Sequence, residues 1–215
     1  MYRILLVDDH AVVRKGMKAI LQDGLPGVAV SEASSGDEAL AAIAAATDAA
    51  PFDTVVLDLS MPGRSGIDLL SEIKHRHARL PVLIMSLHPE EQFAVRALQA
   101  GAAGYLTKAA AAEQLLGAVV KVARGGRYVS EALAERLAAD VGGKRSAAAV
   151  PHERLSDREF EVLRGIASGK GVSDIAAEMH LSVKTVSTYR TRLLEKMGMA
   201  SNAELTRYAL QNGLV

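Results

Sequence analysis

ILLVDD at residues 4–9 and TVVLD at residues 54–58 are two apolar, β-branched runs that each end on aspartate. Such runs predict buried strands, which puts Asp8, Asp9 and Asp58 at the carboxyl ends of two strands. A parallel α/β sheet binds its ligands outside the carboxyl ends of its strands. Three carboxylates gathered there repel one another unless a cation lies among them. Carboxylate oxygens suit Mg²⁺, which also takes water and a phosphate oxygen, so the cluster indicates a site for phosphoryl chemistry.

The composition is that of a globular protein. Hydrophobic residues make up 49% of the 215 residues, the formal net charge is zero and the mean hydropathy is +0.13. No apolar stretch approaches the roughly 18 residues that a membrane span needs. The N-terminal MYRILLVDDH enters a predicted strand with no signal-peptide pattern, so we expect a cytoplasmic protein without a membrane partner. The lack of cysteine excludes disulfides, thiolate nucleophiles and thiolate zinc sites.

Residues 1–124 alternate short apolar runs with amphipathic stretches, which is typical of βα units around a parallel sheet. We expect strands near residues 2–7, 28–33, 53–58, 81–86 and 103–106. We expect helices near residues 11–22, 36–47, 66–76, 89–100 and 112–124. Ser35 is suited to cap the second helix, and Pro62 with Gly63 predicts a turn after Asp58. Five βα units predict one doubly wound α/β domain.

The remainder of the chain follows a different pattern. Residues 130–139 predict a short helix, and residues 142–153 mix Gly, Ala, Ser and Pro without periodicity, as flexible linkers do. Residues 154–215 predict four helices and no strand, with Ser156 or Asp157, Ser182 and Ser201 as N-caps and Gly198 as a stop. The expected division is a phosphoacceptor domain (1–124), a short helix and linker (125–150), and a small all-α domain (151–215).

Two more polar residues end predicted strands, since Ser86 follows PVLIM and Lys108 follows GYLT. A hydroxyl and an ammonium on the same sheet edge as three carboxylates make a charge-balanced pocket for an anion. Asp9 and Asp58 are placed to hold a metal, and Lys108 and Ser86 to contact two phosphoryl oxygens. Carboxylates accept phosphoryl groups covalently in aspartyl-phosphate ATPases, and Asp58 is the candidate acceptor.

The segments LLVDDHAVVRKGM, VVLDLSMPGRSGIDLL, PVLIMSLHPEEQ and ALQAGAAGYLTKA resemble the receiver domain of bacterial two-component response regulators. The resemblance covers essentially all of residues 1–124. It implies a flavodoxin-like (βα)5 fold and Mg²⁺-dependent transfer of a phosphoryl group from a sensor histidine kinase to Asp58. It further implies roles for five other residues and the Ser60 backbone: Asp8 and Asp9 as the acidic pair, the Ser60 carbonyl as a metal ligand, Ser86 as the switch hydroxyl, Lys108 as the pairing lysine and Tyr105 as the switch aromatic.

Two positions depart from the receiver pattern. Many receivers have a cis proline after the lysine, but Ala109 stands here. Because a cis peptide bond before a residue other than proline costs about 2.5–4 kcal/mol, we predict a trans bond.

Many receivers also have a small residue after the switch hydroxyl, where this chain has Leu87. We hypothesise that Leu87 shields an acyl phosphate; a Leu87→Ala protein with an unchanged dephosphorylation rate would remove that hypothesis.

The stretch SVKTVSTYRTRLLEKM, residues 182–197, sorts into two faces on a helical wheel. The apolar face holds Val186, Tyr189, Leu193 and Met197. The opposite face offers donors and acceptors to base edges and cations to phosphates; it holds Lys184, Ser187, Thr188 and Thr191, edged by Arg192 and Lys196. Arg190 lies beside the apolar stripe, where it either reaches a phosphate or makes a subunit contact. With the preceding short helix this predicts a helix-turn-helix from about Val172 to Thr191, although a solvated basic helix is the alternative on the wheel alone.

Residues 154–205 resemble the LuxR-type helix-turn-helix through LSDREFEVLRGIASGKGVSDIAAEMHLSVKTVSTYRTRLLEKMGMASNAEL. With a receiver in front, the whole chain resembles a NarL/FixJ-family response regulator. That resemblance implies double-stranded DNA with inverted-repeat promoter sites as the target, and a homodimer formed on activation through the last helix, around Ala203 to Leu210. It also implies that the unphosphorylated receiver masks the DNA-binding helix. Family members often have lysine where Ser187 stands, so we expect a weaker electrostatic component of DNA binding.

Three alternatives remain beside this interpretation. In the first, Asp8 and Asp9 only cap a helix and Asp58 only ends a strand; five matching strand ends argue against it. In the second, the protein is a phosphohydrolase resembling the haloacid dehalogenases, but those want a D-x-D arrangement after the first strand. We therefore expect no enzyme beyond slow self-dephosphorylation. In the third, DNA binding is independent of phosphorylation, which the intact pocket disfavours.

Overall fold

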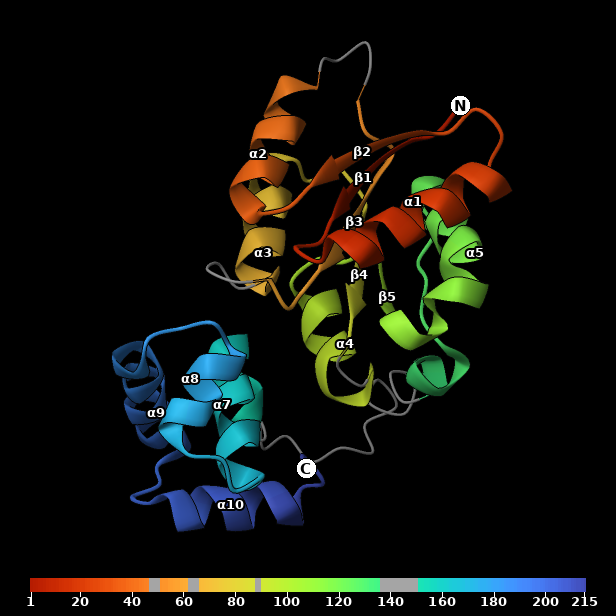
Figure 1. Cartoon of the computed structure of the whole chain (residues 1–215). Coiled ribbons are helices and arrows are strands. Elements are labelled where there is room, and N and C mark those ends of the chain that lie inside the picture. Colours follow the sequence, from red (N-terminus) through yellow and green to blue (C-terminus); the bar gives the residue numbers. More distant parts are fainter. Residues whose placement is uncertain (47–50, 62–65, 88–89, 136–150) are drawn as a thin grey trace. The chain divides into compact units, whose positions relative to one another are not determined.

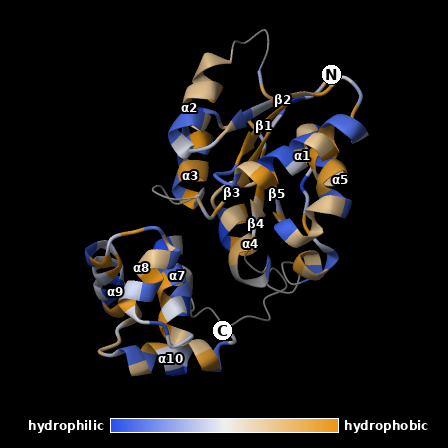
Figure 2. Ribbon diagram, in the orientation of Figure 1, coloured by the Kyte–Doolittle hydropathy of each residue, from blue (hydrophilic) through white to orange (hydrophobic). Residues whose placement is uncertain are grey.

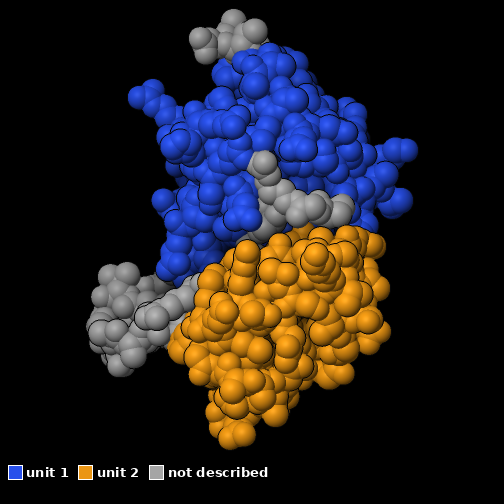
Figure 3. Space-filling view, turned by 90° about the vertical axis from the view of Figure 1, so that its left-hand side faces the viewer, with its two compact units in different colours: residues 1–145 blue, residues 146–215 orange. Residues whose placement is uncertain are grey.

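The computed structural model describes residues 1–46, 51–61, 66–87, 90–135 and 151–215. The chain divides into two compact units, residues 1–145 and 146–215 (Figure 3). Among the described residues, no helix is both long and apolar enough to cross a membrane.

The first unit is built on a five-stranded parallel sheet. Its strands are β1 (Arg3–Val7), β2 (Ala29–Ala33), β3 (Thr54–Asp58), β4 (Val82–Ser86) and β5 (Gly104–Thr107). The strand order is β2-β1-β3-β4-β5, so the direction of winding reverses between β1 and β3. Doubly wound sheets bind ligands at this switch point, outside the carboxyl ends of the strands. The predicted flavodoxin-like fold is confirmed.

Helices cover both faces of the sheet (Figure 1). They are α1 (Ala11–Gly24), α2 (Gly36–Ala45), α3 (Gly66–Arg76), α4 (Glu90–Gln99) and α5 (Ala111–Ala123). Helices α1 and α5 lie on one face, and α2, α3 and α4 lie on the other (Figure 1). The central strands β3 and β4 are buried along their whole length and hydrophobic apart from polar residues at their ends (Figure 2), because a doubly covered parallel sheet buries both of its faces.

The predicted boundaries in this unit lie within two residues of the observed ones. Ser35 caps α2 as expected, since its hydroxyl accepts a hydrogen bond from Glu38 N at 3.2 Å. The predicted turn at Pro62 and Gly63 lies outside the described residues.

After α5 the chain returns to the open edge of β5. Tyr128 N donates to Ala103 O at 2.9 Å, and Tyr105 N donates to Tyr128 O at 3.1 Å. Ser130 N donates to Glu90 Oε1 of α4 at 3.2 Å, and the helix that begins at residue 131 buries Leu133. Residues 128–133, here called the edge segment, are therefore attached to β5 and α4. The rest of the predicted short helix and residues 142–150 of the predicted linker lie outside the described residues.

Close packing of the edge segment depends on a glycine in β5. A Cβ atom at Gly104 would lie 2.5 Å from Tyr128 O and 3.0 Å from Leu83 Cδ1. Gly104→Ala is thus expected to displace the edge segment and to lower the free energy of unfolding by about 1–3 kcal/mol, as overpacking does. Urea unfolding followed by circular dichroism measures this loss, and hydrogen exchange at the Tyr105 and Tyr128 amides locates it.

Gly117 supplies the matched control for that substitution. It is exposed inside α5, and no neighbouring group lies within 4 Å of the place that an alanine Cβ would take, so Gly117→Ala should stabilise by up to about 1 kcal/mol. Equal effects of the two substitutions would show that the edge segment does not press on Gly104.

The second unit is a bundle of four helices after a 3-10 turn at Pro151–Arg154. The helices are α7 (Asp157–Ala167), α8 (Val172–Glu178), α9 (Val183–Met197) and α10 (Asn202–Gln211). Ser156 forms a capping box with Glu159, and Ser182 and Ser201 cap α9 and α10. Gly198 ends α9 in the left-handed region at φ 64°. These caps agree with the sequence-based predictions.

Candidate functional site

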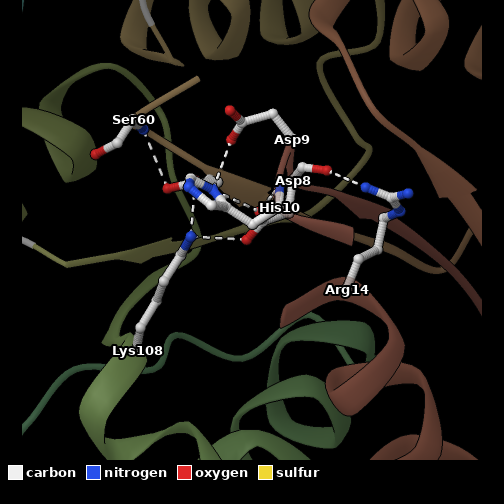
Figure 4. Close-up of polar contacts among 7 residues, drawn as sticks. Asp8, Asp9, His10, Arg14, Ser60 and Lys108 are labelled. Atoms are coloured by element: carbon white, nitrogen blue, oxygen red, sulfur yellow. Dashed lines mark hydrogen bonds and ion pairs between the residues drawn. The ribbon is translucent and has the colours of Figure 1, made fainter. Parts of the chain in front are cut away.

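The three predicted aspartates meet at the switch point of the sheet, and Figure 4 shows Asp8 and Asp9 there beside His10 and Lys108. Asp8 follows β1, Asp58 is the last residue of β3, and both side chains are fully buried. Asp9 is 21% exposed at the rim. One ligand atom from each of Asp8, Asp9, Asp58 and also His10 lies within 4.8 Å of the others. The tertiary structure therefore brings together the carboxylates that the sequence places at two strand ends.

Lys108 lies between two of these carboxylates. Its Nζ is 2.8 Å from Asp58 Oδ2, to which it donates a hydrogen bond, and 2.7 Å from Asp8 Oδ2. Lys108 is delivered by the end of β5 and is itself only 8% exposed. A single ammonium is thus shared by two buried carboxylates, which leaves the site with an excess of negative charge.

Burial and the shared hydrogen bonds shift the pKa values of Asp58 and Lys108. Burial raises the pKa of Asp58 above its usual value, and the charge of Asp8 adds to the rise, although hydrogen bonds from Lys108 and Ser60 oppose it. Burial alone would lower the pKa of Lys108, but its hydrogen bonds to Asp58 and Asp8 outweigh burial and raise it. Lys108 therefore stays protonated. A further positive charge near Asp58 would stabilise its ionised carboxylate.

Backbone and arginine contacts orient the acidic loops. Asp8 Oδ1 accepts a hydrogen bond from His10 N at 2.7 Å, and Asp58 Oδ1 accepts one from Ser60 N at 3.0 Å. Arg14 of α1 donates from Nη1 to the Asp8 carbonyl at 2.6 Å and from Nε to Glu32 Oε2 at 3.1 Å. These contacts hold both aspartates before any ligand arrives.

The predicted switch residues lie in β4 and β5, the two strands beyond β3. Ser86 ends β4, next to the pairing of Asp58 with Met85, and is fully buried. Tyr105 lies in β5 and is 1% exposed, so its ring is packed inward. The Lys108–Ala109 bond is trans as predicted, because no peptide bond between described residues is cis. Leu87 is 70% exposed, and its shielding of an acyl phosphate stays a prediction.

The residues present fit a divalent cation. Asp8 Oδ2 lies 2.7 Å from the Lys108 ammonium and Asp9 Oδ1 lies 2.9 Å from His10 Nδ1, and both oxygens are buried. Buried carboxylate oxygens in a site with excess negative charge are what a hard cation binds. The acidic cluster is therefore consistent with a metal site.

Helix α9 of the second unit has the two faces that the sequence predicts. Val186, Leu193 and Met197 are buried, and Tyr189 is half-buried. The opposite face is exposed; it carries Lys184, Ser187, Thr188, Thr191, Arg192 and Lys196. A shallow hollow of about 260 Å³ on this face is lined by Lys184, Thr185, Thr188, Tyr189 and Arg192. His180, at φ 53°, turns the chain between α8 and α9, completing a helix-turn-helix.

Two basic residues of the predicted DNA face make contacts inside the unit. Arg190 Nε donates to Asn202 Oδ1 at 2.6 Å, which ties α9 to the start of α10. Lys196 Nζ lies 2.7 Å from Glu159 Oε2, whose side chain is 3% exposed. Burial would raise the pKa of Glu159, but hydrogen bonds from Lys196 and Ser156 lower it below its usual value.

Lys196→Met is expected to lower the free energy of unfolding by about 1 kcal/mol, because the pair is half-exposed on the lysine side. Since the folded pKa of Glu159 is lowered, the pair's contribution is present at neutral pH and is lost as the pH falls through that pKa. The salt dependence of DNA binding should stay unchanged. A fall of about one in the slope of log K against log salt would instead show that Lys196 leaves Glu159 for a phosphate.

Sequence reasoning missed His10 and Arg14. Their signals were present: Asp8, Asp9 and His10 form an unbroken run of metal-ligand residue types after a strand, and Arg14 lies one helical turn further on.

Two family models match the chain: "Response regulator receiver domain" over residues 4–120 and "Bacterial regulatory proteins, luxR family" over residues 153–209. The chain belongs to the response regulator family, in its NarL/FixJ branch. This response regulator is 35% identical to the response regulator UvrY of Escherichia coli, over 100% of its own length and 96% of that protein. It is 36% identical to the response regulator GacA of Pseudomonas protegens, over 100% and 98%.

Solved structures of response regulators also match. RcsB from Salmonella enterica serovar Typhimurium, bound to promoter rprA in the presence of the phosphomimetic BeF3⁻, shares 26% identity at a TM-score of 0.60; the match covers 97% of this chain and 98% of that one. The protein is a two-component response regulator with a DNA-binding LuxR-type domain, and so a transcription factor rather than a classical enzyme. The phosphohydrolase alternative is set aside.

Proposed function

We propose that a sensor histidine kinase phosphorylates this response regulator on Asp58 and thereby shifts it to a DNA-binding dimer. The observation that carries the proposal is the shared ammonium: Lys108 lies within 2.8 Å of two fully buried carboxylates. In the transfer, an Asp58 carboxylate oxygen attacks the phosphorus of the kinase's phosphohistidine. A P–O bond forms, the P–N bond breaks, and the imidazole leaves.

Mg²⁺ is the proposed cofactor. Asp9, Asp58 and the Ser60 carbonyl would hold it, with Asp8 beside them, and when bound it neutralises charge on the phosphoryl oxygens. Lys108 then leaves its bridging position and pairs with a phosphoryl oxygen. The Ser86 hydroxyl donates to another.

The phosphorylated state is proposed to act by a population shift. Ser86 and Lys108 end β4 and follow β5, so their attraction to the phosphoryl group favours one arrangement of that edge. Tyr105 belongs to the same edge, and its amide is bonded to Tyr128 of the edge segment. We propose that this edge carries the effect of phosphorylation toward the DNA-binding unit, since the edge segment precedes that unit in the sequence.

The second unit is proposed to place α9 in the major groove of inverted-repeat promoter sites, with α10, around Ala203 to Leu210, as the dimer contact. A relative supports the binding of DNA by dimers: in one solved structure, two RcsB dimers are bound to two parallel DNAs. The proposed contacts are the exposed residues of α9, with Arg190 and Lys196 engaged as described above. We propose a functional division into a receiver domain (residues 1–124), a short helix and linker (125–150) and a DNA-binding domain (151–215). As a regulator of promoters, the protein would act in the cytoplasm.

A gel shift on genomic promoter fragments tests the proposal. The full-length protein is incubated with and without acetyl phosphate and Mg²⁺, beside the Asp58→Asn protein. Acetyl phosphate should raise the affinity of the wild-type protein and leave that of Asp58→Asn unchanged. Equal occupancy by both proteins in all conditions would mean that DNA binding does not depend on phosphorylation.

A further inference from the structure

His10 is a metal-ligand residue placed against the acidic cluster, and neither the proposed transfer nor the helix-turn-helix uses it. Its Nδ1 lies 2.9 Å from Asp9 Oδ1 and 3.4 Å from Asp8 Oδ1. Figure 4 shows the imidazole lying across the carboxylates. Among the described residues, this is the group of His, Asp and Glu side chains that is compact enough to hold a metal ion.

The geometry is close to that of a coordination shell. Zinc–nitrogen and zinc–oxygen bonds measure about 2.0–2.2 Å, so two ligand atoms of a tetrahedral ion lie about 3.3–3.6 Å apart. The four ligand atoms lie within 4.8 Å of one another. Closing them on an ion needs the most distant pair to approach by roughly 1 Å, and the histidine at the rim is 56% exposed.

The imidazole changes which metal the site prefers. Mg²⁺ takes oxygen ligands and keeps several waters, so a ring nitrogen adds little to its affinity. Imidazole suits Zn²⁺, Ni²⁺ and Cu²⁺, and the affinity of such sites for divalent first-row ions rises from Mn²⁺ to Cu²⁺ and falls again at Zn²⁺. A site of carboxylates alone gains less from such ions than a site of carboxylates with a histidine.

We propose that His10 Nδ1 is a ligand that makes the phosphoacceptor site of this protein a binding site for first-row transition metal ions such as Zn²⁺ and Co²⁺. The inference rests on the proposed function, because it uses the same aspartates that would hold Mg²⁺. Nδ1 faces the carboxylates, and the His10 side chain as a whole is 56% exposed.

Occupation by such an ion would oppose phosphorylation. Zn²⁺ held by His10, Asp8, Asp9 and Asp58 has four protein ligands, the closed arrangement of structural zinc sites, with no position left for a phosphoryl oxygen. It would also hold the acceptor carboxylate itself. Lys108 contests the same two carboxylates at 2.7 and 2.8 Å, so the transition metal must displace that ammonium.

The test measures metal binding directly, at fixed pH, on the full-length protein. Co²⁺ is titrated by its visible absorption, and Zn²⁺ and Mg²⁺ by calorimetry, with wild-type, His10→Gln and Asp58→Asn proteins. Glutamine keeps a side chain that can hydrogen-bond to Asp9 but removes the imidazole. We expect His10→Gln to weaken Co²⁺ and Zn²⁺ at least tenfold and to change Mg²⁺ affinity less than about twofold.

A His75→Gln/His77→Gln protein controls for metal binding by histidines outside the site. These two residues lie at the end of α3 and just after it. That protein should bind all three ions as the wild type does. If its Co²⁺ and Zn²⁺ binding is lost instead, or if His10→Gln binds them like the wild type, the inference is wrong. If His10→Gln binds Co²⁺ and Zn²⁺ like the wild type, weaker Mg²⁺ binding by Asp58→Asn would still support the proposed Mg²⁺ site. Full Mg²⁺ binding by Asp58→Asn would contradict the proposed function itself.

Discussion

Lys108→Met is expected to lower the free energy of unfolding at neutral pH by about 3–5 kcal/mol, the usual cost of leaving a buried charge without its partner. Lys108 is the cation shared by Asp8 and Asp58, whose side chains are fully buried at 2.7 and 2.8 Å from its Nζ. Methionine preserves most of the volume but leaves two carboxylates facing each other without compensation. Urea unfolding monitored by circular dichroism measures the loss.

The defect should depend on pH in a defined direction. Burial already raises the pKa of Asp58, and loss of Lys108 raises it further. A raised folded pKa means that stability is present at low pH and is lost as the pH rises through that pKa. The difference between Lys108→Met and wild type should therefore be small in acid and grow toward neutral pH. Added Mg²⁺ should recover part of it, because a ligand that binds only the folded state stabilises that state.

Asp58→Asn is the matched control. It removes the carboxylate whose burial is unfavourable and leaves Lys108 paired with Asp8, so at neutral pH we expect a gain of about 0.5–2 kcal/mol. By the same sign argument the gain should vanish in acid, where the wild-type Asp58 is protonated. The double variant Lys108→Met/Asp58→Asn should have a clearly higher free energy of unfolding than Lys108→Met alone. Equal stability of Lys108→Met and wild type would show that the shared ammonium contributes nothing.

Arg192→Glu is expected to weaken binding of promoter DNA at least tenfold, about 1.4 kcal/mol. Arg192 is exposed on α9 and lines the shallow hollow with Lys184 and Thr188. The substitution removes a phosphate partner and adds a repelling charge. The slope of log K against log salt should therefore become shallower by about one for the lost cation, with a further decrease from the added anion. Fluorescence anisotropy at several salt concentrations measures both quantities.

Ser187→Lys is the opposite control on the same face of α9. It adds a cation at an exposed position and should raise affinity and steepen the salt slope by about one. Both variants should unfold like the wild type, since neither position is buried. A Ser187→Lys protein with an unchanged slope would indicate that this face does not approach the phosphates.

The alternation of apolar runs and amphipathic stretches was sufficient to predict the strands and helices of the first unit, because a parallel sheet covered on both sides needs continuous apolar strands. Capping residues such as Ser156 and Ser201 predicted helix starts for an equally local reason: their hydroxyls accept hydrogen bonds from backbone N–H groups three residues further on. The wheel of α9 separated Val186 and Leu193 from Lys184 and Thr188 because helical spacing alone decides that separation.

Contacts between distant residues could not be obtained in this way. The pairing of Lys196 with Glu159 joins α9 to α7, and that of Arg190 with Asn202 joins α9 to α10. Each depends on how helices pack, so the wheel left both basic residues on or beside the DNA face. The edge segment was hidden for the same reason, since Tyr128 meets β5 only after α5 has crossed the sheet.

The sequence by itself determined the elements, their order and the residue types at the strand ends, since these follow from short-range periodicity and turn chemistry. Only the tertiary structure decided that one ammonium serves two buried carboxylates and that a histidine faces them. Those facts arise from strand order, which brings the ends of β1, β3 and β5 to one edge of the sheet. The interactions among these charges depend on the distances between strand ends, and those distances are fixed only when the sheet forms.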